Sequence, residues 1–196
     1  SLTLSGTLTQ SGNITIDVAD NKTLTYSGAA VEIGEYTLNV IGGGILNNNN
    51  ALVLASGGSK LLLDSTTLNK ASTSSGSLGL DVNANSTVTS LSVGHTTPVS
   101  IAANKTLSGA IAVSAGSIKL NETGTLASTI AMSGGTLDAD DSMAVSGALT
   151  QSGDITIDVA DNKTLTYSGT AISLGANTLT LIGGGTLSNT NALVLN

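Results

Sequence analysis

The chain of 196 residues has no cysteine, no tryptophan, no phenylalanine, one proline (Pro98) and one histidine (His95). Proline removes a backbone donor, so its near absence suits a chain in which nearly every N–H joins a hydrogen-bonded ladder. His95 has no second histidine, cysteine or arginine to complete a site, so we interpret it as a solvated corner residue. The lack of cysteine fits an extracellular bacterial protein without disulfides, and equally a cytosolic one.

Positive charge is also scarce, because six lysines and no arginine stand against thirteen acidic residues, for a formal net charge of −7. Such a chain has no basic stripe to follow a phosphate backbone, so we expect no nucleic-acid partner. No apolar run approaches the roughly 20 residues of a membrane span, and the first residues do not resemble a signal peptide. Since the chain starts and stops within a repeat, we expect an excerpt of a longer array.

Repetition is the dominant feature of the sequence. Residues 8–54 recur almost unchanged at 149–195, an offset of 141 residues. Self-similarity at a fixed period is typical of repeat architectures, in which each unit stacks on its neighbours. The offset divides into seven shorter segments of 19 to 23 residues, namely 19–40, 41–63, 64–82, 83–101, 102–120, 121–139 and 140–159.

Each short segment closes with an apolar-polar-apolar triplet, which predicts a strand with one inward face. The closing pairs are Ile16 and Val18, Leu38 and Val40, Leu61 and Leu63, Leu80 and Val82, Val99 and Ile101, Ile118 and Leu120, Leu137 and Ala139, Ile157 and Val159, and Leu179 and Leu181. A second predicted column holds Leu24, Leu46, Leu68, Val88, Leu107, Leu126, Val145, Leu165 and Leu187. A third inward stretch includes Leu52 and Leu54, Leu91 and Val93, Ile111 and Val113, and Ile130 and Met132.

Corners rich in Gly, Asn and Ser separate these strands. Glycine reaches positive φ without steric cost, so we expect it to form the bends before the closing strands. The glycines at these places are Gly12, Gly34, Gly94, Gly116, Gly134 and Gly135. No window shows the apolar spacing of a helix, while Thr, Val and Ile dominate the strand-like triplets.

The sequence therefore predicts an all-β fold, a single-stranded parallel β-helix (β-solenoid) that spans residues 1–196 as one continuous domain. It would have about ten turns of 19 to 23 residues, with three short strands per turn. At roughly 4.8 Å per turn, the rod would be on the order of 50 Å long.

Segments such as NKTLSGAIAVSAGSIKL and GTLASTIAMSGGTLDA resemble the repeats of filamentous-haemagglutinin-type adhesins and autotransporter passenger domains. The phrases LTLSGTLTQSG and LGANTLTLIGGGTL are similar to the Gly-Thr-Leu strand repeats of autotransporter passengers. The resemblance covers the whole chain. It implies a right-handed β-helix displayed on a bacterial cell surface, acting as a stalk, spacer or adhesive shaft.

Two acidic clusters are the candidate metal or acid-base groups. Asp17 and Asp20 recur as Asp158 and Asp161, and a second cluster holds Asp138, Asp140 and Asp141. Paired carboxylates could bind Ca²⁺ or act on a sugar chain. The calcium-binding nonapeptide GGxGxDxux is absent, however, and the chain has no arginine for lyase chemistry. We predict no catalytic, cofactor-binding or metal-binding residue.

Polar residues form partial columns of their own. Threonines stand at the fifth place of a segment (Thr23, Thr87, Thr106, Thr125, Thr164 and Thr186) and asparagines at the third (Asn21, Asn85, Asn104 and Asn162). Stacked identical polar residues stabilise a solenoid by hydrogen bonding along its axis. A regular Thr-x-Thr array could instead bind ice, but Ile45 and Ala144 interrupt it. Tyr26 and Tyr167 repeat because their segment is copied, and three tyrosines make a poor carbohydrate platform.

We expect a structural or adhesive role without catalysis, in a secreted or cell-surface bacterial protein. The alternative is a carbohydrate-dependent or calcium-dependent binding module, with ice binding as a weaker one. The expected partners are neighbouring solenoid segments and surface glycans. Head-to-tail self-association is expected through the bare aliphatic ends at Leu2 and Leu4, and at Leu193 and Leu195.

Overall fold

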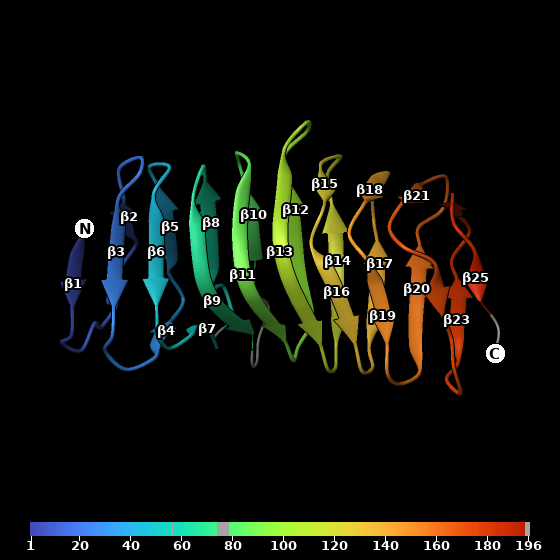
Figure 1. Cartoon of the computed structure of the whole chain (residues 1–196), viewed down its shortest axis with the longest axis horizontal. Helices are drawn as coiled ribbons and strands as arrows, with labels where there is room; N and C mark the ends of the chain where they lie inside the picture. Colours follow the sequence, from blue (N-terminus) through green and yellow to red (C-terminus); the bar gives the residue numbers. More distant parts are fainter. Residues whose placement is uncertain (56, 74–78, 195–196) are drawn as a thin grey trace.

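The computed structural model describes residues 1–55, 57–73 and 79–194. These residues form parallel strands stacked as a β-solenoid of about nine turns, with about 21 residues per turn. This confirms the predicted fold class, with about nine turns where ten were expected. The described residues contain no helix, and therefore none that could cross a membrane. Successive turns lie side by side along the long axis (Figure 1).

The first face is an unbroken ladder of nine parallel strands. They are β2 (Ile14–Asp17), β5 (Thr37–Ile41), β8 (Lys60–Asp64), β10 (Gly79–Val82), β12 (Thr97–Ile101), β14 (Ser117–Asn121), β17 (Thr136–Ala139), β20 (Ile155–Val159) and β23 (Leu179–Ile182). The copied strand β20 lies seven places after β2, so seven turns separate the two copies.

The second face is a row of ten strands, again all parallel. They are β1 (Leu2–Leu4), β3 (Thr23–Tyr26), β6 (Ile45–Asn48), β9 (Thr67–Thr73), β11 (Ser86–Val93), β13 (Thr106–Val113), β15 (Thr125–Leu126), β18 (Met143–Val145), β21 (Thr164–Tyr167) and β24 (Thr186–Asn189). The third face contains β4 (Val31–Ile33), β7 (Leu52–Leu54), β16 (Thr129–Met132), β19 (Leu149–Gln151), β22 (Ile172–Ser173) and β25 (Leu193–Val194).

Three turns depart from the predicted pattern of three separate strands. In β9, β11 and β13, the second-face strand continues without a break into the third face. The register between β11 and β13 shifts between Val88 and Leu91, which is a bulge that bends the strand. Gly109 sits at this bend with a φ of 120°, and a Cβ there would strike the Val88 carbonyl. In this turn the bulge therefore takes the place of the corner that would separate the second-face strand from the third-face strand.

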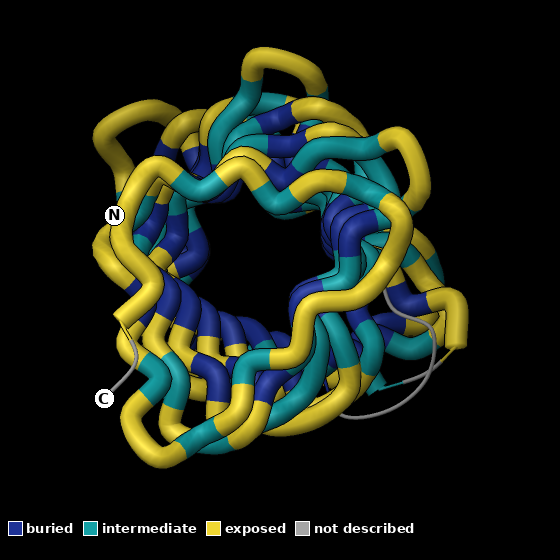
Figure 2. The backbone as a smooth tube through the Cα atoms, turned by 90° about the vertical axis from the view of Figure 1, so that its right-hand side faces the viewer, coloured by how far each residue is buried: buried dark blue, intermediate teal, exposed yellow. Residues whose placement is uncertain are grey.

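Aliphatic side chains fill the inside of the coil. Buried and exposed stretches alternate along the tube, and the loops that project outward are mostly exposed (Figure 2). On the third face the predicted inward residues stack in register, with Leu91 beside Ile111 and Ile111 beside Ile130. Leu38, Leu107 and Ile118 are completely buried. Each such side chain contributes about 1.5 to 3 kcal/mol of burial free energy, so each turn adds a similar amount to the stability of the core.

The predicted stacking partners on the first face are wrong at three steps, each time by two residues. Ile14 rather than Ile16 pairs with Leu38, Thr97 rather than Val99 pairs with Ile118, and Ile155 rather than Ile157 pairs with Leu179. On the second face, Leu107 pairs with Ser86 and Leu165 with Met143, where Val88 and Val145 were expected. A shift of two residues keeps every side chain on its face, so the alternation cannot reveal it.

Positive φ is concentrated at the corner between the first and second faces. Asparagine supplies it three times, at Asn21, Asn104 and Asn162, with φ of 57° to 60°. Ser65 and Glu122 adopt it at the same corner of other turns. Of the six glycines predicted to need it, only Gly116 and Gly135 have positive φ. Asn21, Asn104 and Asn162 therefore shape the bend, because asparagine tolerates this conformation better than most residues. The fourth asparagine of the predicted column, Asn85, instead accepts a hydrogen bond from Thr106 N of the next turn at 3.0 Å.

The third face is interrupted between β19 and β22, and in the first copy it begins only at β4, the counterpart of β22. β19 pairs with β16, whereas the next strand, β22, pairs with β25 in a separate two-stranded sheet. A tyrosine hydroxyl fills the break, since Tyr167 Oη accepts a hydrogen bond from Leu149 N at 3.0 Å and donates one to Thr170 O at 2.8 Å. Tyr26 Oη likewise accepts a hydrogen bond from Leu8 N at 3.1 Å. These tyrosines are core residues with a bridging role.

Candidate functional site

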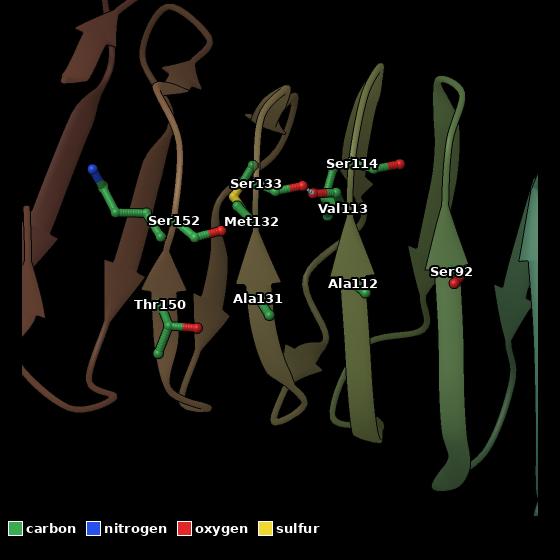
Figure 3. Close-up of a pocket in the computed structure, with 10 residues that line it drawn as sticks. Ser92, Ala112, Val113, Ser114, Ala131, Met132, Ser133, Thr150 and Ser152 are labelled. Carbon is green, nitrogen blue, oxygen red and sulfur yellow. Dashed lines mark hydrogen bonds between the residues drawn. The ribbon is translucent and has the colours of Figure 1, made fainter. Parts of the chain in front are cut away.

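A groove with a volume of about 440 Å³ lies on the outer side of the third face. Its floor is a row of outward side chains on neighbouring strands, Ser92 on β11, Ala112 on β13, Ala131 on β16 and Thr150 on β19 (Figure 3). One wall is a row of corner serines, Ser114, Ser133 and Ser152. The solenoid register places these side chains in line along the axis.

The chemistry of this groove is neutral. Ser114 Oγ and Ser133 Oγ each donate to the carbonyl of the preceding turn at 3.4 Å, Ser114 to Val93 and Ser133 to Val113. Its lining consists of hydroxyls, aliphatic groups, the Met132 thioether and one amide, with no ionisable side chain. Such a surface can hold a ligand by contact and hydrogen bonds, but it offers no general acid or base.

The three carboxylates Asp138, Asp140 and Asp141 pair with two lysines from neighbouring turns. Lys119 Nζ lies 2.9 Å from Asp140 Oδ2 and 3.5 Å from Asp138 Oδ2, and Lys163 Nζ lies 2.6 Å from Asp141 Oδ1. The described residues include no group of three or more His, Cys, Asp or Glu side chains that could hold a metal ion. The cluster is thus an ion-pair network on the outer surface.

The pKa directions follow from this geometry. Burial raises the pKa of the Asp138 carboxyl, and the charge of Asp140 raises it further. The Lys163 hydrogen bond lowers the pKa of Asp141, helped by the donated Glu122 N–H. Hydrogen bonding to Asp140 raises the pKa of Lys119. The protonated form of Asp138 is therefore favoured relative to an ordinary aspartate.

Asp17 and Asp20 do not join this network. They lie at the end of β2 and in the turn after it, against the glycine corner of the next turn, where a Cβ on Gly42 or Gly43 would meet their carboxylates. Their copies Asp158 and Asp161 contact Gly183 and Gly184 in the same way. These carboxylates thus occupy space beside the glycine backbone that the Cβ atom of any other residue would fill.

The remaining sequence-predicted residues are His95 and the threonine columns, which do not form a common site. His95 is exposed at the corner between β11 and β12, where its carbonyl accepts a bond from Thr97 Oγ1 at 2.9 Å. Threonines pair across turns at Thr67 and Thr87, and at Thr106 and Thr125. Ile45, which is 43% exposed, separates Thr23 from Thr67. The threonine array is thus short and interrupted.

Gln10 and its copy Gln151 are polar residues that the sequence pattern did not single out. Gln10 is buried, and its Nε2 donates to Gly12 O at 3.0 Å and to Thr37 O at 3.1 Å. Its copy Gln151 stacks on Met132, and both of its amide atoms are buried without a hydrogen-bond partner. The alternation in Leu149-Thr150-Gln151 gave the signal, since it places Gln151 on the inward face.

The fold and the neutral groove together define the class of the protein, a parallel β-solenoid with a hydroxyl-lined lateral surface. No family model, no curated protein and no solved structure matches the chain. The functional conclusions below therefore depend on the residues of this chain.

Proposed function

We propose that the chain is a rigid, non-catalytic shaft segment of a secreted or cell-surface bacterial protein. In this role it holds an adhesive part away from the surface, and its length is set by the number of turns. The observation that best supports this proposal is that the nine parallel strands of the first face form one ladder without a break. A continuous ladder resists bending because every bend must break hydrogen bonds between turns.

The sequence supports the extracellular part of this proposal. The strand motifs are similar to those of haemagglutinin-type adhesins and autotransporter passengers, and the net charge of −7 discourages contact with nucleic acid or anionic lipid. The ion pairs on the surface join neighbouring turns, as Lys60 with Asp81 at 2.5 Å, which adds to cohesion along the axis.

Self-association belongs to the same proposal. At one end of the coil Leu2 is 62% exposed and Leu4 44%, and at the other Leu181 is 52% exposed and Leu193 43%. Leu195, which was predicted with them, lies outside the described residues. Further turns of the same type, including those of a second copy, would cover these apolar faces. A strict monomer in sedimentation at millimolar concentration would contradict this part.

A display experiment tests the shaft function. The chain, or two copies in tandem, is placed between a membrane anchor and a reporter domain on a bacterial cell, and antibody access to the reporter is measured. Access should rise with the number of copies and exceed that given by a Gly/Ser linker of equal residue count, which coils. If the flexible linker gives equal access, the proposed function is wrong.

A further inference from the structure

The C-terminal end of the coil presents a surface that also occurs in the first copy of the repeat, where the next turn covers it. β23 is the last strand of the first face (Figure 1), and its sequence at 178–185 repeats that of β5 and its corner at 37–44. Both strands pair in the same register with the turn before them. The same strand face is therefore present twice, once inside the coil and once at its end.

The exposed fractions of equivalent side chains show how much the next turn covers. Val40 is completely buried, whereas its copy Leu181 is 52% exposed. Leu52 is 2% exposed, and its copy Leu193 is 43% exposed. A hollow of about 260 Å³ opens beside Leu181, at the corner between β23 and β24. The C-terminal end therefore has room and apolar surface for one more turn.

The first copy shows which segment fits this surface. There β8 lies on β5 and β9 lies on β6, in both cases with leucines against aliphatic side chains. Thr66, at the corner between β8 and β9, is buried and donates its hydroxyl to Gly44 O at 3.2 Å. The copy of Gly44 is Gly185, and both corners close with the same backbone bond, from Gly44 N to Val18 O and from Gly185 N to Val159 O. A fitting segment therefore has two leucines in alternation, followed three residues later by a buried hydroxyl.

An asparagine adds recognition of the backbone. In the first copy Asn48 is completely buried, its Oδ1 accepts a hydrogen bond from Lys70 N at 3.1 Å, and its Nδ2 donates one to Lys70 O at 2.7 Å. One amide thus satisfies both backbone polar groups of a residue in the next turn. Its copy Asn189 lies at the open end, where its Oδ1 accepts a hydrogen bond from Asn191 N of its own turn at 3.1 Å. The C-terminal end therefore carries an amide that can hold the backbone of an added strand.

We propose that the C-terminal end of the coil binds an extended segment of a partner chain, parallel to β23 and β24, with the sequence pattern of residues 60–71. This is strand addition to an exposed sheet edge, in which backbone hydrogen bonds supply affinity and alternate side chains supply specificity. The inference deepens the self-association part of the proposed function and rests on it, because it names the segment that this end accepts.

The test is a titration of a fluorescein-labelled peptide, with the sequence of residues 60–71, with the full chain, followed by fluorescence polarisation. Binding should saturate with one site per chain. Leu181→Asp should weaken it about tenfold or more, because the peptide would then bury a carboxylate in place of a leucine. Leu181 is 52% exposed in the free chain, so this variant keeps its fold. Leu4→Asp, at the N-terminal end, is the matched control and should leave the affinity unchanged.

A variant peptide tests the pattern without any change in the protein. With Leu61→Asp and Leu63→Asp together, the peptide should not bind, because both side chains that would face the core are then charged. Asn189→Leu in the protein should weaken binding of the original peptide, because it removes the amide that holds the peptide backbone.

Three results would overturn the proposal. They are the absence of saturable binding up to millimolar protein, equal weakening by Leu4→Asp and Leu181→Asp, and displacement of the labelled peptide by Leu181→Asp protein at a lower concentration than by unlabelled peptide. The last would assign the surface to the N-terminal end of a second copy, which this variant keeps intact. Self-association in sedimentation without peptide binding would refute this inference alone, and none of these results changes reporter access in the display experiment.

Discussion

The tyrosine that closes the ladder break should carry much of the local stability. Replacing Tyr167 by phenylalanine keeps the ring in the core but removes the hydroxyl. Leu149 N–H and Thr170 C=O then lose partners at 3.0 Å and 2.8 Å. Because a buried group left unsatisfied costs about 1 to 3 kcal/mol, and Thr170 O is only partly buried, Tyr167→Phe should lower the free energy of unfolding by about 2 to 3 kcal/mol.

Urea unfolding followed by circular dichroism measures this change, with the midpoint and the m-value reported for each variant. Tyr26→Phe removes the one bond from Leu8 N, at 3.1 Å in a partly buried place, and should cost about 1 kcal/mol. Tyr36→Phe is the surface control. Tyr36 is 37% exposed, so this change should stay within about 0.5 kcal/mol.

The order of the three variants is the decisive result. If Tyr167→Phe is no more destabilising than Tyr36→Phe, the hydroxyl does not bridge the break. A large change in m-value without a change in midpoint would also contradict the reasoning, because it would place the effect in the unfolded chain.

Further variants test the corners and the acidic cluster by the same unfolding assay. Ser65→Gly should stabilise the protein by about 0.5 to 1 kcal/mol, since Ser65 has a φ of 55°, and an unchanged midpoint would refute this. Gly109→Ala should destabilise it, because the new Cβ would strike the Val88 carbonyl, and wild-type stability would show that the bulge adapts. Asp138 has a raised pKa in the folded state, so the folded protein keeps the Asp138 proton to higher pH than the unfolded chain does. The contribution of Asp138 to the free energy of unfolding therefore falls as the pH rises above about 4. Asp138→Asn should therefore be more stable than the wild type at pH 7 and equal to it at about pH 3, and the opposite order at pH 7 would contradict the pKa direction.

The faces of the coil could be predicted from the sequence, because burial on one side of a strand forces strict alternation. Leu38, Val40, Leu61 and Leu63 are at most 1% exposed, as their pattern predicts. The register between turns could not be predicted to better than two residues. Pairing Ile14 or Ile16 with Leu38 leaves the same face inside, and only the lengths of the corners decide between them.

The bridging residues escaped prediction for a different reason. Tyr26 and Tyr167 are buried at 5% and 2% exposure, yet their repetition looked like a by-product of copying. Their role depends on a break in the third face that no periodic pattern records. Gln151 was overlooked because a polar residue on an inward position breaks the apolar rule.

The central claim is that the chain is a stiff coil whose length grows by one strand spacing per turn. Because the chain has no cysteine, spin labels can be placed at Thr15→Cys on β2 and Thr180→Cys on β23, both exposed on the first face. These strands are the first and last of the nine, so the label distance from pulsed electron paramagnetic resonance should be narrow and centred near about 40 Å. Deleting the 19-residue turn 102–120 should shorten it by about 5 Å. A broad distribution, or no shortening in the folded deletion variant, would contradict the account.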